Sequence, residues 1–310
     1  MNLTSQPPVT YFIIKGISDV PELQVPIFLL VLLIYLMILG GNMTIFLLVC
    51  MDHHLHTPMY FFLCNLSIMD IMSSTITLHK VLVKFLSGDS TVSLHACMTQ
   101  IFVFTSLVCN ELLILTAMSY DRYVAICNPM HYLTIMSGRV CATLSIACWL
   151  WGFLVTIPHV VILSQLTCYK SKEINHFFCD ILPLLKLSCN DTSLSNLLIL
   201  ICGLFLATFP FLFTFIPYGF IIATIMKINS TSGKYKAFYT CSSHITLVIL
   251  LYLTLVCQYL RPISKDSLES NKLFSLFNTA AVPMLNPLIY SLKNKDVKSA
   301  FRRRWHKIIA

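Results

Sequence analysis

The sequence predicts an all-α membrane protein: a single domain with a seven-transmembrane helix bundle and a short amphipathic C-terminal helix. Three observations lead to this fold class. Apolar residues make up 57% of the 310 residues and charged residues only 11%, against about 45–50% and about 25% in soluble domains. The mean hydropathy is +0.79. Seven stretches hold the roughly 20 apolar residues that cross a bilayer as a helix. The composition therefore excludes a soluble enzyme, a disordered chain and a disulfide-rich secreted module.

The expected helices follow one another along the whole chain, and each satisfies its backbone hydrogen bonds internally. Their approximate ranges are 25–50, 58–78, 98–124, 140–163, 196–226, 237–260 and 273–292. No internal repeat is present, so the inverted-repeat design of many transporters gains no support. We expect residues 1–24 to form an extracellular N-terminus, residues 25–292 the helix bundle and residues 293–310 a cytoplasmic amphipathic tail.

Charge and a glycan acceptor set the expected orientation. With the tail inside, twelve Lys and Arg lie on the inner side and nine on the outer side, which gives modest agreement with the positive-inside rule. An Asn-x-Thr acceptor at Asn2 is useful only on the lumenal side. The pattern of a cleavable signal peptide is missing, so the first helix is expected to direct insertion. We expect a multi-pass plasma-membrane glycoprotein with its N-terminus extracellular and its C-terminus cytoplasmic.

The thirteen cysteines fall into two groups, and their odd number leaves at least one unpaired. Nine lie in or at the ends of apolar spans, where cysteine acts as a small buried hydrophobe. The other four are Cys97, before the third span, and Cys168, Cys179 and Cys189, in the loop between the fourth and fifth spans. Four cysteines allow three pairings, and spacing does not choose among them. Because the loop has about 32 residues, long for a structureless connection, we expect it to fold over the bundle mouth and to be cross-linked.

The tail has the pattern of a short helix lying on the inner membrane surface. Its apolar residues at roughly helical spacing are Val297, Phe301, Trp305 and Ile308. Its basic residues, expected to meet anionic lipid, are Lys298, Arg302, Arg303, Arg304 and Lys307. A nuclear localisation signal is the alternative interpretation, and seven upstream spans argue against it.

Two acidic residues, Asp70 and Glu111, fall inside expected spans. An acid at the bilayer centre costs about 2.5–3.5 kcal/mol on insertion scales, so it normally faces the bundle and has a partner. No basic residue lies mid-span to neutralise either carboxylate. Two carboxylates close together can hold a cation or share a proton. The alternative is a pair of protonated or water-bonded acids in a polar cavity.

Four blocks of sequence carry a specific resemblance. They are LHTPMYFFL at 55–63, MSYDRYVAIC at 118–127, KAF, TC and SH within 236–244, and PMLNPLIYSL at 283–292. Their order and spacing resemble the signature blocks of vertebrate odorant (olfactory) receptors, which are rhodopsin-like (class A) G-protein-coupled receptors. The similarity covers essentially residues 10–302. A lone Asp-Arg-Tyr would be weak evidence, whereas four long blocks in order are specific.

The resemblance implies a switch at the inner end of the third helix. Arg122 would pair with Asp121 at rest and turn to the G protein when the inner helix ends separate. A permanently charged guanidinium with five donors suits that exchange of partners. The alternative is an interfacial arginine that only holds the helix at its depth. The other switch residues that the resemblance implies are Tyr123, Tyr218, Lys236, His244 and Tyr290.

The resemblance also implies an ion and two cross-links. A sodium ion would lie near Asp70 and Glu111, with Asn42 and Asn286 close by, and no cofactor would be required. The implied disulfides are Cys97–Cys179 and, as the second pair, Cys168–Cys189.

The ligand pocket implied by the resemblance lies in the outer half of the bundle, beneath the loop. On the third helix its residues recur at i, i+3, i+4, i+7 and i+8, which places them on one face. The predicted lining residues are Ile101, Phe104, Thr105, Val108, Cys109, Cys202, Leu206, Tyr252, Leu255, Tyr259 and Thr279. Apolar walls with a few hydroxyls are typical of small-molecule sites. Ordinary interhelical packing is the alternative for any single member.

Two absences narrow the ligand class. No acid lies in residues 98–110 to pair with a cationic amine, and no lysine lies in residues 273–292 to form a retinal Schiff base. The absences leave a small, largely neutral hydrophobic ligand. The resemblance implies a receptor, not an enzyme, that binds such odorants and activates a stimulatory G protein of the cyclic AMP pathway. No nucleic acid partner is expected.

The sequence leaves two alternative functions, a channel or transporter and a membrane hydrolase. A channel or transporter would use Asp70 and Glu111 as a cation path, but it needs a longer chain of polar residues through the membrane. A membrane hydrolase would use His53, His54 and His56 as metal ligands. That short loop has no carboxylate beyond Asp52 to complete such a site.

Overall fold

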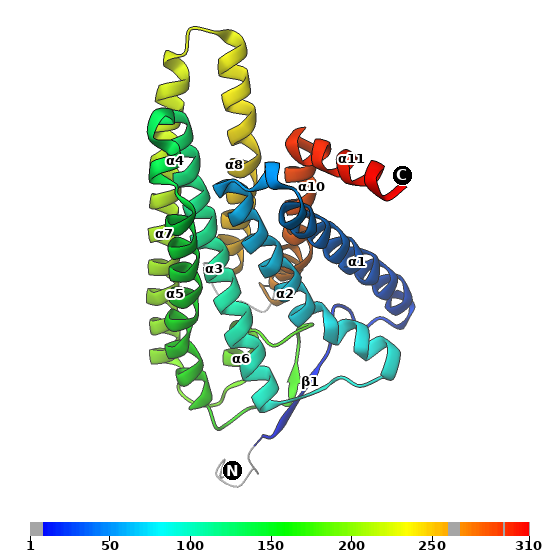
Figure 1. The fold of residues 1–310 in the computed structure, drawn as a ribbon. Helices are drawn as coiled ribbons and strands as arrows, with labels where there is room; N and C mark the ends of the chain where they lie inside the picture. The colour runs from blue at the N-terminus through cyan, green and yellow to red at the C-terminus, as the bar shows by residue number, and fades with distance from the viewer. Residues whose placement is uncertain (1–8, 260–266, 294, 310) are drawn as a thin grey trace, which may run out of the picture.

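The computed structural model describes residues 9–259, 267–293 and 295–309. Long helices form the bundle, a small sheet lies at one end near the N-terminus, and the C-terminal helix lies at the other (Figure 1). We call these the sheet end and the tail end. In the described residues six helices are long and apolar enough to cross a membrane. They are α1 (Pro21–Met51), α2 (Pro58–Ser87), α3 (Leu94–Cys127), α5 (Gly138–Ser164), α7 (Ser193–Lys227) and α8 (Thr231–Tyr259).

The seventh crossing is helical but interrupted. It consists of α9 (Ser267–Leu276), the π-turn η4 (Phe277–Ala281) and α10 (Val282–Lys293), which follow one another without a gap. A π-turn breaks the regular i→i−4 hydrogen-bond ladder, so neither α-helical piece has the length of a full span. The prediction of a seven-helix bundle is confirmed, with this break inside the last helix.

Several helices extend beyond the apolar runs that predicted them. α1 begins at Pro21 rather than 25, α2 ends at Ser87 rather than 78, and α8 begins at Thr231 rather than 237. Hydropathy marks only the part of a helix that lies in lipid, so polar turns at either end escape it. α2 ends at Gly88, whose φ of 71° lies in the left-handed region that favours glycine at a helix C-terminus. In Figure 1, α7 and α8 run past the other helices at the tail end.

A three-stranded sheet at the sheet end was not predicted. Its strands are β1 (Tyr11–Ile14), β2 (Thr91–Ser93) and β3 (Glu173–Ile174). β1 lies in the middle, antiparallel to β2 and parallel to β3. The N-terminal segment therefore joins two loops of the bundle, and Phe12 and Ile14 are buried against them. Lys15 and Glu173 add an ion pair at 3.2 Å.

The loop between α5 and α7 is folded, as its length predicted. It contains β3 and a short helix, α6 (Ile181–Leu187), which Asp180 caps by accepting a hydrogen bond from the Ile181 N–H at 2.8 Å. Disulfides join Cys97 to Cys179 and Cys168 to Cys189. The first disulfide fixes the loop to the sheet end of α3.

The C-terminal helix α11 (Lys295–Ile309) docks on the tail end of the bundle. Val297 and Ala300 are buried, as expected for the apolar side of an amphipathic helix. Arg303 Nη2 donates to Asp52 Oδ2 at 2.8 Å, next to the short turn η2 (His53–Leu55). This basic residue was expected to face lipid, and it binds the protein instead. The side chains of Trp305, Lys307 and Ile308 are not among those that the structure describes.

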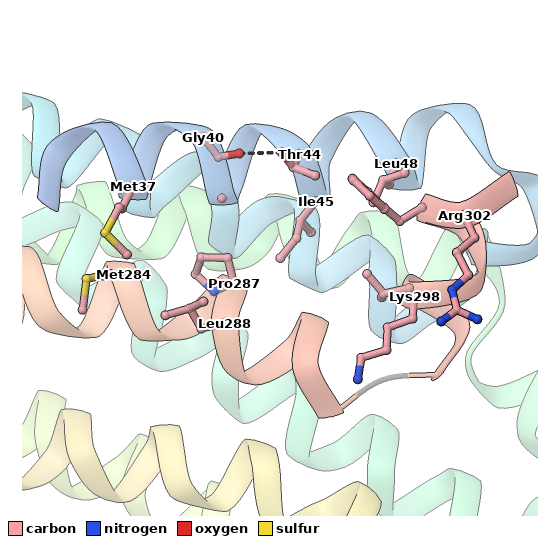
Figure 2. A pocket seen from close by; sticks show the side chains of 13 residues that line it. Met37, Gly40, Thr44, Ile45, Leu48, Met284, Pro287, Leu288, Lys298 and Arg302 are labelled. Atoms are coloured by element: carbon pink, nitrogen blue, oxygen red, sulfur yellow. Dashed lines mark hydrogen bonds between the residues drawn. The ribbon is translucent and has the colours of Figure 1, made fainter. Parts of the chain in front are cut away.

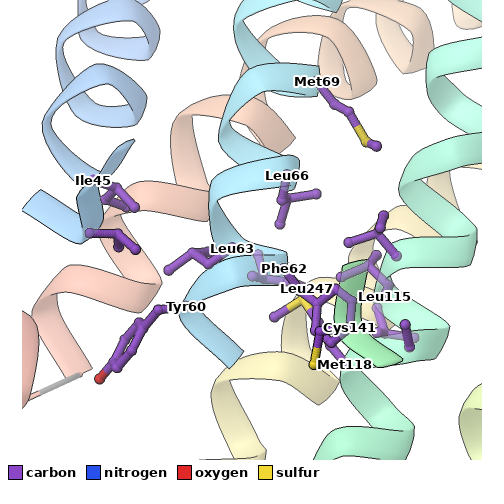
Figure 3. Packing of buried hydrophobic residues seen from close by; sticks show 14 of the residues in the cluster. Ile45, Tyr60, Phe62, Leu63, Leu66, Met69, Leu115, Met118, Cys141 and Leu247 are labelled. Atoms are coloured by element: carbon purple, nitrogen blue, oxygen red, sulfur yellow. The ribbon is translucent and has the colours of Figure 1, made fainter. Parts of the chain in front are cut away.

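The main apolar core lies around α3, which packs against α2, α5, α7 and α8 (Figure 3). Phe62 and Leu66 of α2 meet Leu115 and Met118 of α3 there. Because lipid is as apolar as these side chains, close packing and hydrogen bonds between helices stabilise such a bundle. Both are present between neighbouring helices. Asn65 of α2 accepts hydrogen bonds from two side chains of α5, Ser145 Oγ at 2.7 Å and Trp149 Nε1 at 3.0 Å. The hydroxyl oxygens of Ser106 in α3 and Thr156 in α5 lie 2.6 Å apart and are hydrogen-bonded.

Candidate functional site

A buried ion pair lies at the tail end of α3. The Asp121 side chain is fully buried, and its Oδ2 lies 3.2 Å from Arg122 Nη2. Tyr132, on the short helix α4 (Tyr132–Ile135), donates its hydroxyl to Asp121 Oδ1 at 2.8 Å. A buried carboxylate is tolerated only when opposite charge and hydrogen bonds compensate for lost water. Here each carboxylate oxygen faces one partner, and Tyr132 is a partner that sequence reasoning missed.

A second contact at the tail end joins α7 to α8. The Tyr218 hydroxyl and His244 Nδ1 lie 2.6 Å apart, and the two rings stack with centroids 5.8 Å apart. Tyr123, next in sequence to Arg122, packs against the apolar cluster that contains Tyr218. Three predicted switch residues are therefore together where α3, α7 and α8 meet. The side chains of the other two, Lys236 and Tyr290, lie outside the described ones.

Two carboxylates and an amide meet in the middle of the bundle. Asn286 Nδ2 of α10 donates to both carboxylate oxygens of Asp70, at 3.1 and 2.9 Å. The Asn286 side chain also interacts with Glu111 of α3, so the two carboxylates lie around one amide. Asn42 has a different role: its amide donates to the carbonyl of Pro283 at 3.0 Å and holds α1 to α10.

The donor atoms of this group suit a hard cation. Carboxylate and amide oxygens are the ligands that such ions prefer. Among the described residues no cluster of three or more His, Cys, Asp or Glu could hold a metal ion. A cation at Asp70 and Glu111 would therefore need hydroxyl, carbonyl or water oxygens in addition to the two carboxylates.

Glu111 also lines a small cavity between α2, α3, α8 and η4. Phe104, Val108 and Leu255, three of the predicted ligand residues, form part of its apolar wall. Its polar wall comes from Glu111 and Asn278 together with the hydroxyl residue Ser73. The cavity volume is about 10 Å³, near the minimum that holds one water molecule.

Phenylalanines of the loop explain why this cavity is small. Phe177 and Phe178 are fully buried, in one cluster with Leu78 of α2 and Ala280 of η4. The ring of Phe178 meets that of Phe104 edge to face, with centroids 5.0 Å apart. The space beneath the loop, where the pocket was predicted, is therefore filled by side chains of the loop itself.

The other predicted pocket residues are divided among different surroundings. Cys109 and Leu206 line a groove of about 290 Å³ between α3, α5 and α7. Phe209 and Trp151 in its wall are about half exposed, so this groove faces the membrane. Ile101 is buried in the core beneath the loop, and Tyr252 packs against Phe211 and Phe215. The Thr279 hydroxyl donates to the Ser275 carbonyl. Thr105 and Cys202 are half-buried. The side chain of Tyr259 lies outside the described ones.

A polar network beside the cavity was also missed. Gln258 Nε2 of α8 donates to Ser275 Oγ at 2.9 Å and to Asp180 Oδ2 of the loop at 3.3 Å. Asn278 Nδ2 donates to Gln258 Oε1 at 2.9 Å, and Thr254 donates to the Asn278 amide oxygen. The network joins α8, the last crossing and the loop. Amide side chains inside apolar spans were the signal that could have revealed it.

Fold and site together define a seven-helix membrane protein of the receptor type, in which α3 both lines a small cavity and carries a buried ion pair. Comparison with known proteins agrees. The olfactory receptor family model matches residues 31–307. Olfactory receptor 5B12 of Homo sapiens is 46% identical over 295 residues, covering 95% of this chain and 94% of that receptor. Olfactory receptor 8U3 of Mus musculus is 45% identical over 299 residues, covering 96% and 94%.

The chain belongs to the olfactory receptor family. Members of this family are G-protein-coupled receptors and not enzymes, so the chain is a multi-pass membrane receptor. Odorant recognition and G-protein coupling follow from that membership.

Proposed function

We propose that this receptor binds small, largely neutral hydrophobic odorants in an enlarged form of the cavity around Phe104, Val108 and Leu255. One observation carries the proposal: α3 is continuous from Leu94 to Cys127, so a single helix bears both the cavity and the Asp121–Arg122 pair. A ligand that displaces one end of α3 can therefore act on the other. The apolar wall favours apolar ligands, and Asn278 and Ser73 offer the polar contacts.

Ligand binding requires the cavity to expand. A small-molecule site usually has about 300–1,000 Å³, far more than the 10 Å³ of the cavity in this structure. The ring of Phe178, which contacts Phe104 in the cavity wall, would have to move aside. A ligand shifts an equilibrium only by its difference in affinity for the two states. The closed cavity gives an odorant strong preference for the expanded state.

The proposed output is nucleotide exchange on a stimulatory G protein. In the closed state Arg122 is held by Asp121, and Asp121 by Tyr132. When the tail ends of the helices separate, the arginine becomes available to the G protein. The resemblance of the signature blocks to odorant receptors supports the stimulatory class.

For the orientation we propose that the sheet end is extracellular and the tail end cytoplasmic, in the plasma membrane. Both disulfides lie at the sheet end, and disulfides persist in oxidising compartments. The basic α11 lies at the tail end, as the positive-inside rule requires. Asn2, the proposed glycan acceptor, lies outside the described residues.

The test is a cyclic AMP measurement in cells that express the receptor, against a broad odorant panel. We expect a rise with at least one hydrophobic odorant, and no rise with Arg122→Ala at equal surface expression. Val108→Trp, which fills the cavity, should also remove the response. Silence across the panel with good surface expression, or a response that Arg122→Ala leaves unchanged, would contradict the proposal.

We also propose that Asp70 and Glu111 hold a sodium ion that favours the resting state. The two carboxylates around Asn286, with oxygen donors and a water-sized cavity beside them, support this. Glu111→Gln should abolish any dependence of basal signalling on extracellular sodium. Glu22→Gln, at an exposed position of α1, is the control and should leave that dependence in place. An unchanged sodium response in Glu111→Gln would contradict the proposal that these carboxylates bind a sodium ion.

A further inference from the structure

A large groove lies on the outside of the bundle and shares no lining residue with the odorant cavity. It runs between α1, α10 and α11 and has a volume of about 640 Å³. Figure 2 shows its two ends. Met37 and Met284 lie at one end, and Lys298 and Arg302 lie together at the other. None of the odorant-site and switch residues whose side chains the structure describes lines this groove.

The walls of the groove are mostly apolar and its middle is open. Met37 and Ile45 of α1 lie on the side of Met284 and Pro287 of α10, and Leu48 lies near Arg302 at the tail end. The position of Gly40 is important, because a Cβ added there would meet no atom within 4 Å. The groove therefore accepts a slender apolar chain at this level, and a larger side chain at position 40 would fill it.

The charge in the groove is confined to its tail end. Lys298 and Arg302 are four residues apart on α11, so they lie on one face of the helix and are both exposed. Arg303 is engaged by Asp52 at 2.8 Å. Within the part of the chain that the structure describes, Lys298 and Arg302 form no such ion pair. They leave two positive charges beside an apolar channel.

The length of the groove matches one leaflet of a bilayer. From Met37 to Leu48 a helix rises about 16 Å, and half of the hydrocarbon core is about 15 Å thick. An acyl chain in this groove would therefore begin at the basic pair and end near the bilayer middle. We propose that the groove binds an anionic phospholipid of the membrane, with one acyl chain along Gly40 and the phosphate held by Lys298 and Arg302.

Charge complementarity selects this occupant. A phosphate attracts Lys and Arg near a membrane surface, and the α1 wall of the groove offers a chain mostly apolar contact, with Thr44 as its one hydroxyl residue. The bound lipid would hold α11 against α1 and α10, in addition to the Arg303–Asp52 pair. The proposal does not depend on which odorant or G protein the receptor uses.

Native mass spectrometry of the purified full-length receptor tests this site. The receptor is exposed in detergent to equimolar phosphatidylserine and phosphatidylcholine, and retained lipids are counted. We expect phosphatidylserine to be retained in preference to phosphatidylcholine. Each of Lys298→Gln and Arg302→Gln should weaken its apparent affinity about fivefold, and the double variant about 30-fold. The double variant Arg139→Gln, Lys227→Gln has the same charge change elsewhere on the exposed surface and should bind as the wild type does.

A second pair of matched variants tests the apolar half of the site. Gly40→Leu should remove most phosphatidylserine retention because it fills the groove. Gly203→Leu, at another exposed helix position with no atom within 4 Å, should not. Thermal unfolding of each variant shows that it is folded. Equal retention of both lipids by the wild type, or equal losses with Gly40→Leu and Gly203→Leu, would overturn the proposal. A receptor dimer that Gly40→Leu dissociates would also overturn it, in favour of a second copy of this chain.

Discussion

At the scale of single residues, Asp121 depends on two neighbours. Its fully buried carboxylate is held by Arg122 at 3.2 Å and by the Tyr132 hydroxyl at 2.8 Å. In the proposed switch, the arginine keeps its resting position only while the carboxylate is fixed. The sequence motif predicted the first neighbour, because the two residues are adjacent. It did not predict the second, because Tyr132 lies on a different helix.

Tyr132→Phe removes one of these two contacts and should raise ligand-free signalling. A hydrogen bond to a charged group is worth about 1.5–3 kcal/mol, so its loss should shift the resting equilibrium toward the open state roughly tenfold or more. The measurement is basal cyclic AMP divided by surface expression. Tyr120→Phe, at an exposed position of α3, is the matched control. If both variants have the same basal signal, the hydroxyl does not restrain the switch.

Gly152→Ala should destabilise the contact between α3 and α5. A Cβ at this position would lie 2.1 Å from Asn110 Oδ1, a buried atom that cannot move without disturbing the core. Overpacking of this kind costs about 1–3 kcal/mol. The thermal unfolding midpoint of the purified receptor should therefore fall. Gly203→Ala, where nothing lies within 4 Å, should leave it unchanged, and equal midpoints for the two variants would refute the close approach of the helices.

At the scale of elements, hydropathy predicts the helices well because it is a local property of the sequence. The small sheet could not be predicted in the same way. Its strands have two to four residues each and come from residues 11–14, 91–93 and 173–174, so their pairing depends on the folded bundle. Phe104 and Val108, which the spacing on α3 places on one face, line a small cavity. Phe178 fills most of the space at this cavity, and it belongs to a loop that is distant from α3 in sequence. The spacing of residues on α3 therefore cannot reveal this.

The loop itself should be sensitive to acid through His176. This side chain is 1% exposed, and burial lowers its pKa to about 3, with a further contribution from the charge of Lys272. The folded loop therefore binds the proton only near pH 3, whereas an unfolded loop binds it near the ordinary value of 6.5. Between these values the unfolded state takes up more protons. The stability of the loop is thus constant above about pH 6.5 and falls as the pH is lowered toward about 3.

Hydrogen exchange of residues 165–190, corrected for intrinsic rates, measures this effect. Protection should be lower at about pH 5 than at about pH 7.5, because the unfolded state gains a proton over that interval. His176→Gln, which does not titrate, should have nearly equal protection at the two values. Wild-type protection that is the same at both would show that His176 does not control the loop.

At the scale of the whole molecule, α3 joins the two functional ends. Its sheet end is fixed to the loop by Cys97–Cys179 and meets Phe178 through Phe104. Its tail end holds the Asp121–Arg122 pair. The structure is closed at both ends: the cavity is filled by the loop, and the arginine is bound by the acid. We propose that both features belong to one resting state, so a ligand that opens the first is expected to release the second.

The most direct test is the distance between genetically encoded spin labels at Phe238 of α8 and Arg139 of α5, at the tail end of the purified receptor. Both positions are exposed. The distance is measured without ligand and with the odorant that gives the strongest cyclic AMP response. We predict that it lengthens with odorant in the wild type and stays short in Val108→Trp. An unchanged distance in a receptor that has bound odorant and signals would contradict the coupling of cavity and switch through α3.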